Sequence, residues 1–395
     1  MPVQGSVTNR LEESPALPRG FSLSPSGPAD DGAADIGRRL YLAPAGLVTG
    51  NRARALVAAG RGRPLAGRAE LAFGLVAVLL RRPQGGATVT LCDEPTLTAW
   101  AAEAGPDVAA HVAAGLERLS APRPPFAGLA MDRPHVMGIL NVTPDSFSDG
   151  GDRFAADTAI ADGLAMLEAG ATLLDVGGES TRPGSQPVPP DEEIRRVVPV
   201  VRALAERGAC VSIDTRNAAT MAAAVAAGAR IVNDVTALTW DAEALATVAR
   251  LRVPVVLMHI RGEPQTMQQN PVYDVAPLDV FDWLGARAAA ALAAGVAAAD
   301  ICLDPGIGFG KTLEHNLDIL AWAGVLHGHG LPLLLGLSRK TFIARLSRDE
   351  PPKQRLAGTI AADQTGLANG FQIVRVHDVA EARQACAVWR GVACA

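Results

Sequence analysis

Residues 135–140 read HVMGIL, and they open a series of eight short apolar runs in the second part of the chain. The other seven are TLLDV (172–176), CVSI (210–213), IVND (231–234), VPVVLM (253–258), ICLD (301–304), LPLLLG (331–336) and FQIVRV (371–376). Each run is followed by a segment with the apolar spacing of a helix. Strands that alternate with helices pair in parallel, and eight such units over roughly 260 residues predict a (β/α)₈ TIM barrel.

Two other interpretations of these runs remain open at this point. A short apolar run can be a segment of buried helix, since periodicity alone does not separate the two in short stretches. A doubly wound open sheet also alternates strands with helices. Eight consistent repeats favour the barrel, which we expect to span Met131 to Ala395.

Polar residues close nearly every one of these runs. In a parallel barrel the C-terminal ends of all strands face the same mouth, so residues far apart in sequence converge there. A single Asp or Asn is more often a helix cap or turn former, but a set of this size indicates a site. The residues concerned are Asn141, Asp175, Asp214, Asn233, Asp234, His259, Asp304, Lys340, Arg375 and His377, and the apolar Met258 precedes His259 at the end of its run.

The side chains of this mouth suit a flat heterocycle that carries amino groups. Asp214 and Asp304 accept hydrogen bonds, and Asn233 both donates and accepts them. Lys340 adds a cation. Pterins and guanines present a matching edge of alternating donors and acceptors.

A second group of residues suits an anion. Asn141, Arg375 and His377 can gather phosphate oxygens. An oxygen ligand such as the Asn141 side chain also suits Mg²⁺, which prefers few protein ligands together with phosphate and water. No His or Cys set has the spacing of a zinc site.

Three further stretches concern the mouth of the barrel. PGIGFGKT (305–312) resembles a phosphate loop, but Pro305 stands where a Walker A loop needs glycine. Its glycines are better explained by a tight turn after the sixth strand. The long connections 142–153 and 179–190 are rich in Gly, Pro and Ser, and we expect mobile lids there that exclude water.

Composition excludes several classes of protein. A net charge of −5 without a basic stripe gives no case for nucleic acid binding. The longest apolar run, 71–80, is too short to cross a bilayer, and the N-terminus has no signal pattern, so we expect a cytoplasmic protein. Five scattered cysteines do not predict disulfides.

The first part of the chain carries no recognisable motif. Residues 1–35 have the composition of a disordered tail. For 36–125 we expect a small α/β segment, with a helix near 68–82, a strand at 87–92 and a helix over 97–119. APRPPF (121–126) predicts a stiff linker to the barrel.

Several blocks together resemble one enzyme family. They are MGILNVTPDSFSDGG (137–151), LLDVGGESTRPGS (173–185), SIDT (212–215), IVNDV (231–235), LDPGIGFGKT (303–312), GLSRKTFI (336–343) and VRVHDV (374–379). In this order they are similar to the dihydropteroate synthase family, and the resemblance covers about two-thirds of the chain. It implies that 6-hydroxymethyl-7,8-dihydropterin diphosphate condenses with p-aminobenzoate, with Mg²⁺ as cofactor and a homodimer as the assembly.

The resemblance also implies roles for single residues. Catalysis falls on Asp214, Lys340, Arg375 and Arg182, and pterin binding on Asp214, Asn233, Asp304, Lys340, Arg375 and Met258. The diphosphate falls on Asn141, Arg375 and His377, with the metal at Asn141. The p-aminobenzoate pocket falls on Phe147, Thr181, Arg182, Pro183, Phe309, Lys340 and Thr341.

Two positions depart from the family pattern, and two other functions compete. Thr341 stands where Ser is common, which narrows the p-aminobenzoate pocket by a methyl group. Arg216 stands where Tyr or Ser is expected, and the sequence assigns it no role. The alternatives are a corrinoid-linked methyltransferase barrel, which needs no diphosphate site, and a catalytically silent protein that binds pterin.

Overall fold

The computed structural model describes residues 19–23, 36–142, 152–179, 187–263 and 266–394. Its larger sheet has eight parallel strands in the order β11-β10-β9-β8-β7-β6-β13-β12. The bounds are β6 (His135–Asn141), β7 (Leu173–Gly177), β8 (Val211–Asp214), β9 (Ile231–Asp234), β10 (Val255–Met258), β11 (Ile301–Asp304), β12 (Leu334–Leu335) and β13 (Ile373–Val376). All eight runs of the sequence therefore carry a strand, as expected.

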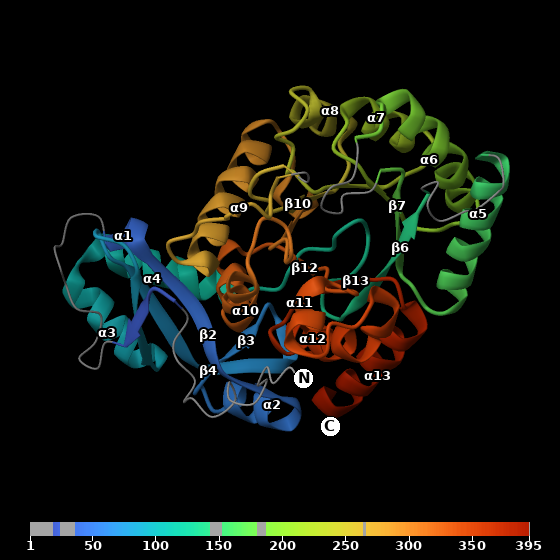
Figure 1. Cartoon of the computed structure of the whole chain (residues 1–395). Helices are drawn as coiled ribbons and strands as arrows, with labels where there is room; N and C mark the ends of the chain where they lie inside the picture. The colour runs from blue at the N-terminus through green and yellow to red at the C-terminus, as the bar shows by residue number, and fades with distance from the viewer. Residues whose placement is uncertain (1–18, 24–35, 143–151, 180–186, 264–265, 395) are drawn as a thin grey trace, which may run out of the picture.

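The sheet closes into a barrel between its two outer strands. Leu303 and Leu333 form a parallel bridge there, and the Leu303 N–H donates to the Pro332 carbonyl at 3.0 Å. Helices follow the strands and surround them (Figure 1). Their bounds are α5 (Asp152–Glu168), α6 (Pro190–Ala205), α7 (Ala218–Ala226), α8 (Ala244–Leu251), α9 (Ala276–Ala293), α10 (Leu313–Ala321), α11 (Thr341–Leu346), α12 (Leu356–Ala368) and α13 (Val379–Cys394), with 3₁₀ turns η2 (Ala298–Asp300), η3 (Ala323–His329) and η4 (Pro352–Gln354). The (β/α)₈ barrel is confirmed.

The linker before the barrel contributes to its interior. Phe126 is fully buried and packs in one apolar cluster with Met131, Met137 and residues of the other strands. Phe126 and Leu129 pair as an antiparallel bridge around a turn in which Ala127 and Gly128 have positive φ. The chain therefore begins to fill the barrel core before Met131, where the sequence placed the start of the domain.

A smaller mixed sheet precedes the barrel. It runs β1-β5-β4-β2, and β3 pairs with β4. The elements are β1 (Phe21–Leu23), α1 (Ile36–Arg39), β2 (Leu40–Thr49), α2 (Gly50–Ala58), β3 (Arg63–Leu65), β4 (Arg68–Arg81), β5 (Ala87–Cys92), α3 (Glu94–Ala104) and α4 (Pro106–Ser120). We call residues 19–23 and 36–120 the N-terminal extension.

Two sequence predictions within the extension were wrong. The helix expected near 68–82 is the strand β4, which pairs antiparallel with β2 and β5. The single helix expected over 97–119 is two helices, because the chain turns at Gly105 with φ 117°. The strand at 87–92 is confirmed. The tail proposed for 1–35 lies mostly outside the described residues.

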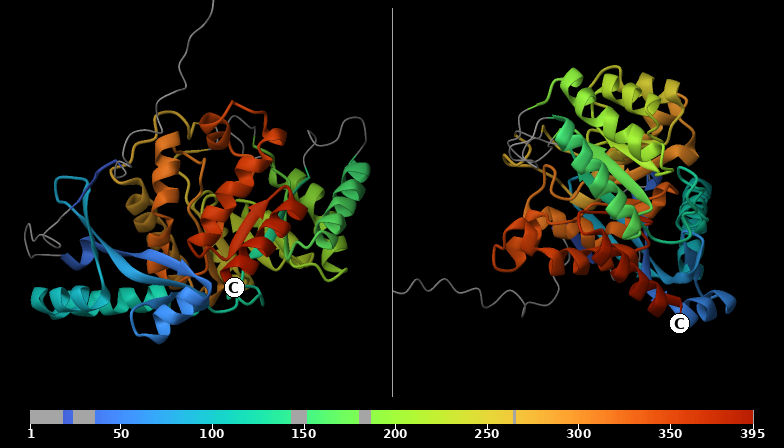
Figure 2. Two further views of the ribbon diagram at one scale, coloured as in Figure 1. Left: turned by 90° about the horizontal axis from the view of Figure 1, so that it is seen from below. Right: turned by 90° about the vertical axis from the view of Figure 1, so that its right-hand side faces the viewer.

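Both faces of the extension sheet are buried, which explains the error at β4. Val76, Val78 and Leu80 pack with α3 and α4 in a core of the extension. The alternate residues Ala77 and Leu79 join the large apolar cluster of the barrel. A strand buried on both faces shows no alternation of apolar and polar residues. Figure 2 shows the extension packed along one side of the barrel.

Candidate active site

An arginine ion pair lies at the centre of the barrel mouth. Arg375 on β13 donates from Nε to Asp175 at 2.6 Å and from Nη2 to Asp214 at 2.7 Å. Asp175 comes from β7 and Asp214 from β8, so three strands converge on one guanidinium group. The strand register pairs Asp214 with Gly177.

The Asp214 carboxyl group is in an unusual electrostatic environment. Its pKa is raised to about 7, mainly by burial; Arg375 opposes this rise, and the neighbouring Asp175 adds to it. A carboxylate that titrates near neutrality inside a cleft is typical of functional sites. Burial also strengthens the interaction of the Asp214 charge with neighbouring charges, because solvent screens them little there.

Asn233 lies beside this ion pair, and Asp234 does not contribute to it. The Asn233 side-chain amide donates to Asp175 at 2.8 Å. Asp234 instead accepts from Thr236 and from the Leu238 N–H, which makes it the turn former of the β9–α8 connection. Asp234 is therefore a turn former, the common role of a single Asp, whereas Asp214 is not.

Asp304 and Lys340 form the opposite side of the mouth. Asp304 Oδ1 accepts the Gly306 N–H at 2.7 Å, and Oδ2 lies near Gly336, where a Cβ would be 3.9 Å from it. The same Cβ would lie 3.8 Å from Cβ of Arg375, so Gly336 separates the two groups. Burial lowers the pKa of Lys340 to about 8, against the attraction of Asp304.

An apolar wall completes this part of the mouth. Met258, Val235, Ile260 and Met267 are buried in one cluster, and Phe309 packs against it. Lys340 Nζ lies 4.9 Å from the centroid of the Phe309 ring. A flat ligand can be held between such a wall and the polar groups.

The motif at 305–312 is a structural loop tied down by a buried lysine. Lys311 donates to the carbonyls of Gly306 and Phe309 at 2.8 and 3.0 Å, and contacts Nδ1 of His259 at 2.8 Å. Gly306 has φ 62°, and a Cβ there would lie 1.9 Å from the His259 carbonyl oxygen. Only glycine fits at that position.

Asn141 and His377 lie at the rims of their strands. Asn141 ends β6 and pairs with Gly177. Nδ1 of His377 lies 2.9 Å from the Ser338 hydroxyl. Among the described residues no group of three or more His, Cys, Asp or Glu side chains could hold a metal ion by itself.

Arg216, to which the sequence gave no role, forms a buried ion pair. Its guanidinium donates to Glu179 at 2.8 and 3.1 Å and lies 3.8 Å from the centre of the Trp240 ring. Glu179 also accepts the Val188 N–H at 3.2 Å, so it joins the two ends of the 179–188 segment. The proposed lids fall mostly, and Phe147, Thr181, Arg182 and Pro183 fall entirely, outside the described residues.

Two further residues support the mouth: Asp175, which the sequence placed there without a specific role, and Glu193, which it did not single out. Asp175 has one oxygen that accepts from both Asn233 and Arg375, and its polar position inside an apolar run was the available signal. Glu193 on α6 is fully buried and accepts from Thr215, Asn217 and Thr220. It thereby holds the turn that follows Asp214. Thr341, the first residue of α11, is exposed next to Lys340.

The fold and the mouth define the class as a pterin-binding barrel enzyme. A family model described as pterin binding enzyme matches residues 137–377. The dihydropteroate synthase of Escherichia coli (strain K12) is 44% identical over 261 residues, which is 66% of this chain and 92% of that protein. The enzyme of the same name from Synechocystis is also 44% identical, over 65% of this chain and 91% of its own length.

Solved structures agree with the sequence relatives. The dihydropteroate synthase of Xanthomonas albilineans with 4-aminobenzoic acid is 48% identical, with a TM-score of 0.64 over 69% of this chain and 98% of its own. The same enzyme in complex with 7,8-dihydropteroate is 46% identical with a TM-score of 0.62, over 69% of this chain and 98% of its own.

The chain belongs to the dihydropteroate synthase family. It is a transferase of the pterinylmethyl group, which condenses 6-hydroxymethyl-7,8-dihydropterin diphosphate with p-aminobenzoate and releases diphosphate.

Proposed function

We propose that the Asp175–Arg375–Asp214 cluster binds the pterin and stabilises the charge that develops on it. The observation that carries this proposal is the convergence of three strands on the Arg375 guanidinium, with Asp214 10% exposed toward the mouth. Asp214 and Asn233 recognise the amino-bearing edge of the ring. Asp304 and Lys340 hold the opposite edge, and Met258 lies against its face.

The reaction breaks the bond between the pterin methylene carbon and the diphosphate oxygen. The bonding electron pair leaves with the diphosphate, and the lone pair of the arylamine nitrogen forms the new C–N bond. The amine then loses a proton to solvent. The carboxylate of Asp214, already in place, stabilises the positive charge that spreads into the ring, which is the most effective form of electrostatic catalysis.

Asn141, Arg375 and His377 are the proposed partners of the diphosphate. An Asn side chain with few other protein ligands fits Mg²⁺, which keeps substrate phosphate and water around it. When bound, Mg²⁺ neutralises charge on the leaving diphosphate. Asn141→Ala should therefore raise the Mg²⁺ concentration needed for half-maximal binding of the pterin diphosphate, measured by titration calorimetry. Unchanged metal dependence would contradict this placement.

The acceptor pocket is proposed to lie between Phe309, Lys340 and Thr341. Phe309 gives an apolar surface for the aromatic ring of p-aminobenzoate, and Lys340 gives a cation for its carboxylate. Arg182, Thr181, Pro183 and Phe147 are proposed to complete the pocket. Arg182→Ala should weaken p-aminobenzoate capture more than pterin diphosphate binding, and equal loss of both would count against its role.

A direct test of the pterin site is the affinity for 6-hydroxymethyl-7,8-dihydropterin, which is the substrate without its diphosphate. Asp214→Asn and Asn233→Ala should each weaken its binding by roughly ten- to a hundredfold, because the first replaces a charged acceptor by a neutral amide and the second removes an amide that donates and accepts hydrogen bonds. Lys353→Ala, an exposed change on η4, is the control. Equal affinity in all three variants would move the pterin site elsewhere.

We also propose that the protein works in the cytoplasm as a homodimer. All five cysteines are unpaired, as is common in reducing compartments. No described helix is both long and apolar enough to cross a membrane. On α13, Val388 and Val392 are exposed at a spacing of one turn, as expected of barrel helices that pack between two copies. Val388→Glu should shift the mass measured by light scattering toward the monomer, and an unshifted mass would oppose this interface.

A further inference from the structure

The extension contacts the connection between β10 and α9 at Asp274. The Gly86 N–H donates to Oδ1 of Asp274 at 2.9 Å, and Nη1 of Arg81 lies 3.2 Å from Oδ2. Gly86 lies in the turn between β4 and β5. Gly20 is also close, because a Cβ there would lie 3.0 Å from the Asp274 carbonyl oxygen. Two separate segments of the extension therefore meet at one residue of the barrel.

Arg81 extends this contact onto α9. Its Nη2 lies 2.9 Å from both Asp279 and Asp282, and Tyr41 donates to Asp282 at 2.9 Å. The Tyr41 ring meets Phe281 edge-on with centroids 5.4 Å apart. The joint thus combines one guanidinium, three carboxylates and an aromatic pair.

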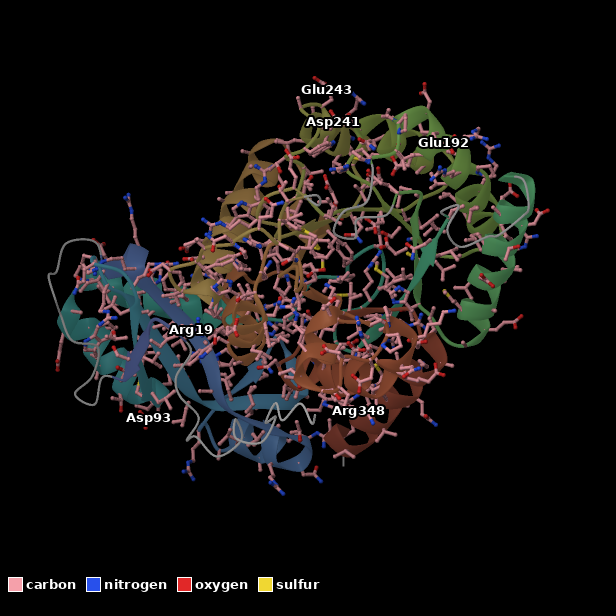
Figure 3. The ribbon with its side chains drawn as sticks, in the orientation of Figure 1. Arg19, Asp93, Glu192, Asp241, Glu243 and Arg348 are labelled. Carbon is pink, nitrogen blue, oxygen red and sulfur yellow. The ribbon has the colours of Figure 1, made fainter. Side chains whose placement is uncertain are left out.

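The extension also holds α10. The Arg19 backbone donates to the Asp318 carboxylate, and the Phe21 ring stacks on Trp322 with centroids 5.0 Å apart. Figure 3 shows Arg19 where the extension adjoins the barrel. In Figure 1, α9 and α10 lie on the side of the barrel that faces the extension. The extension therefore contacts both α9 and α10, and α10 directly follows the 305–311 loop in the chain.

The β10–α9 connection transmits this contact to the mouth. Tyr273, next to Asp274, donates from its hydroxyl to the Gly310 carbonyl at 2.8 Å. Gln268 donates to the Gly308 carbonyl at 2.6 Å. Both acceptors adjoin Phe309 in the chain, and the Phe309 ring lies 4.9 Å from Lys340 Nζ.

We propose that the N-terminal extension is a positioning element for the p-aminobenzoate pocket, acting through Asp274 and Tyr273 on Phe309. This inference rests on the proposed role of Phe309 and Lys340 in that pocket. The family model begins only at residue 137, and the Escherichia coli relative is aligned over 92% of its length. The extension therefore has no counterpart of its size in that relative, and this chain adds a support for a loop that the family shares.

The test separates the two substrates in steady-state kinetics of the full chain. Tyr273→Phe keeps the ring and removes one hydrogen bond, and Arg81→Gln removes the charge at the joint. Each should raise KM for p-aminobenzoate by roughly two- to tenfold, the range expected for one net hydrogen bond. KM for the pterin diphosphate and kcat should stay within about twofold.

Arg63→Gln is the matched control. Arg63 binds Glu94 through two hydrogen bonds of 2.8 and 2.6 Å inside the extension, away from the joint. It should lower the melting temperature without changing either KM. The double variant Arg81→Gln, Tyr273→Phe should raise KM for p-aminobenzoate by less than the product of the single effects, because both changes act on one path.

Two results would overturn the inference. One is an Arg81 variant that loses stability like the Arg63 variant but keeps KM for p-aminobenzoate. The other is an equal rise of both KM values. Lys340→Ala distinguishes this failure from failure of the proposed pocket. If it raises KM for p-aminobenzoate strongly while Tyr273→Phe does not, only the role of the extension fails. If Lys340→Ala also has no effect, the pocket itself is misplaced.

Discussion

The barrel mouth and the extension joint each hold one arginine among carboxylates, but they differ in burial. At the mouth, Arg375 faces Asp175 and Asp214, whose side chains are 0% and 10% exposed. At the joint, Arg81 faces Asp274 and Asp282, whose side chains are 46% and 48% exposed, and Asp279, whose side chain is 21% exposed. Water screens the second set and hardly reaches the first.

Because of this difference in burial, similar ion pairs have different effects in the two places. At the mouth the charges act on any ligand that displaces water, because the low local dielectric strengthens their field. At the joint the carboxylates gain little energy from Arg81, and its value is the geometry it fixes. We therefore expect changes at the mouth to alter chemistry or stability strongly, and changes at the joint to alter placement.

The largest expected effect is a loss of stability at the buried ion pair between Arg216 and Glu179. Arg216 and Glu179 have side chains only 6% and 5% exposed. Arg216→Ser should lower the free energy of unfolding by about 3–5 kcal/mol, because Glu179 is left buried without its partner. Arg195→Gln, at an exposed pair on α6, should change it by less than about 1 kcal/mol. If urea denaturation gave both variants a similar loss in the free energy of unfolding, burial would not distinguish the two ion pairs.

Asp214→Asn should have the next largest effect, and it concerns turnover. Removing a preorganised charge costs about 2.7–4 kcal/mol of barrier, so kcat should fall by roughly 10²–10³. The corresponding change at the joint, Asp282→Asn, should leave kcat within about twofold. Single-turnover measurements of product formation check both values. Wild-type turnover in Asp214→Asn would refute its role in charge stabilisation.

A pH profile sharpens the comparison further. The raised pKa of Asp214, about 7, means that its ionised form is lost as pH falls below that value. The lowered pKa of Lys340, about 8, means that its charged form is lost as pH rises above it. The value of kcat/KM should thus peak between about pH 7 and 8 and fall by up to tenfold per pH unit on each side. Lys340→Arg should remove the alkaline limb only, and a profile that keeps it would assign that limb to another group.

The smallest effect is expected at Thr341. This residue is exposed at the start of α11, so the methyl group that distinguishes it from Ser faces largely open space. One methyl group is worth at most about 0.8 kcal/mol, and Thr341→Ser should change KM for p-aminobenzoate by no more than about fourfold. Inhibition by a sulfonamide, measured alongside, should shift by a similar factor. A larger shift in either would show that the methyl group contacts the acceptor.

The convergence of the mouth was predictable because topology enforces it. Once eight strands are parallel, the ends of distant runs have to meet, which placed Asp214, Asn233 and Arg375 together. The sequence could not show which of these groups bind one another. The bridge from Arg375 to Asp175 depends on rotamers and register, and neither leaves a pattern in the residue order.

The extension was harder to predict for a physical reason. β4 is apolar on both faces because one packs on α3 and α4 and the other on the barrel, so no alternation marked it as a strand. The role of Arg216 was not predicted for another reason. Its partner Glu179 is 37 positions away, and its aromatic neighbour Trp240 lies in a different loop. Pairings of this kind exist only in the folded chain.

The measurement that tests the central claim most directly follows both reaction products in one assay with the 395-residue chain. The protein is mixed with 6-hydroxymethyl-7,8-dihydropterin diphosphate and Mg²⁺, with and without p-aminobenzoate, and diphosphate and dihydropteroate are recorded together. The account predicts equal amounts of the two products, formed only when p-aminobenzoate is present and slowed roughly 10²–10³-fold by Asp214→Asn. Tight binding of the pterin with no dihydropteroate would contradict it.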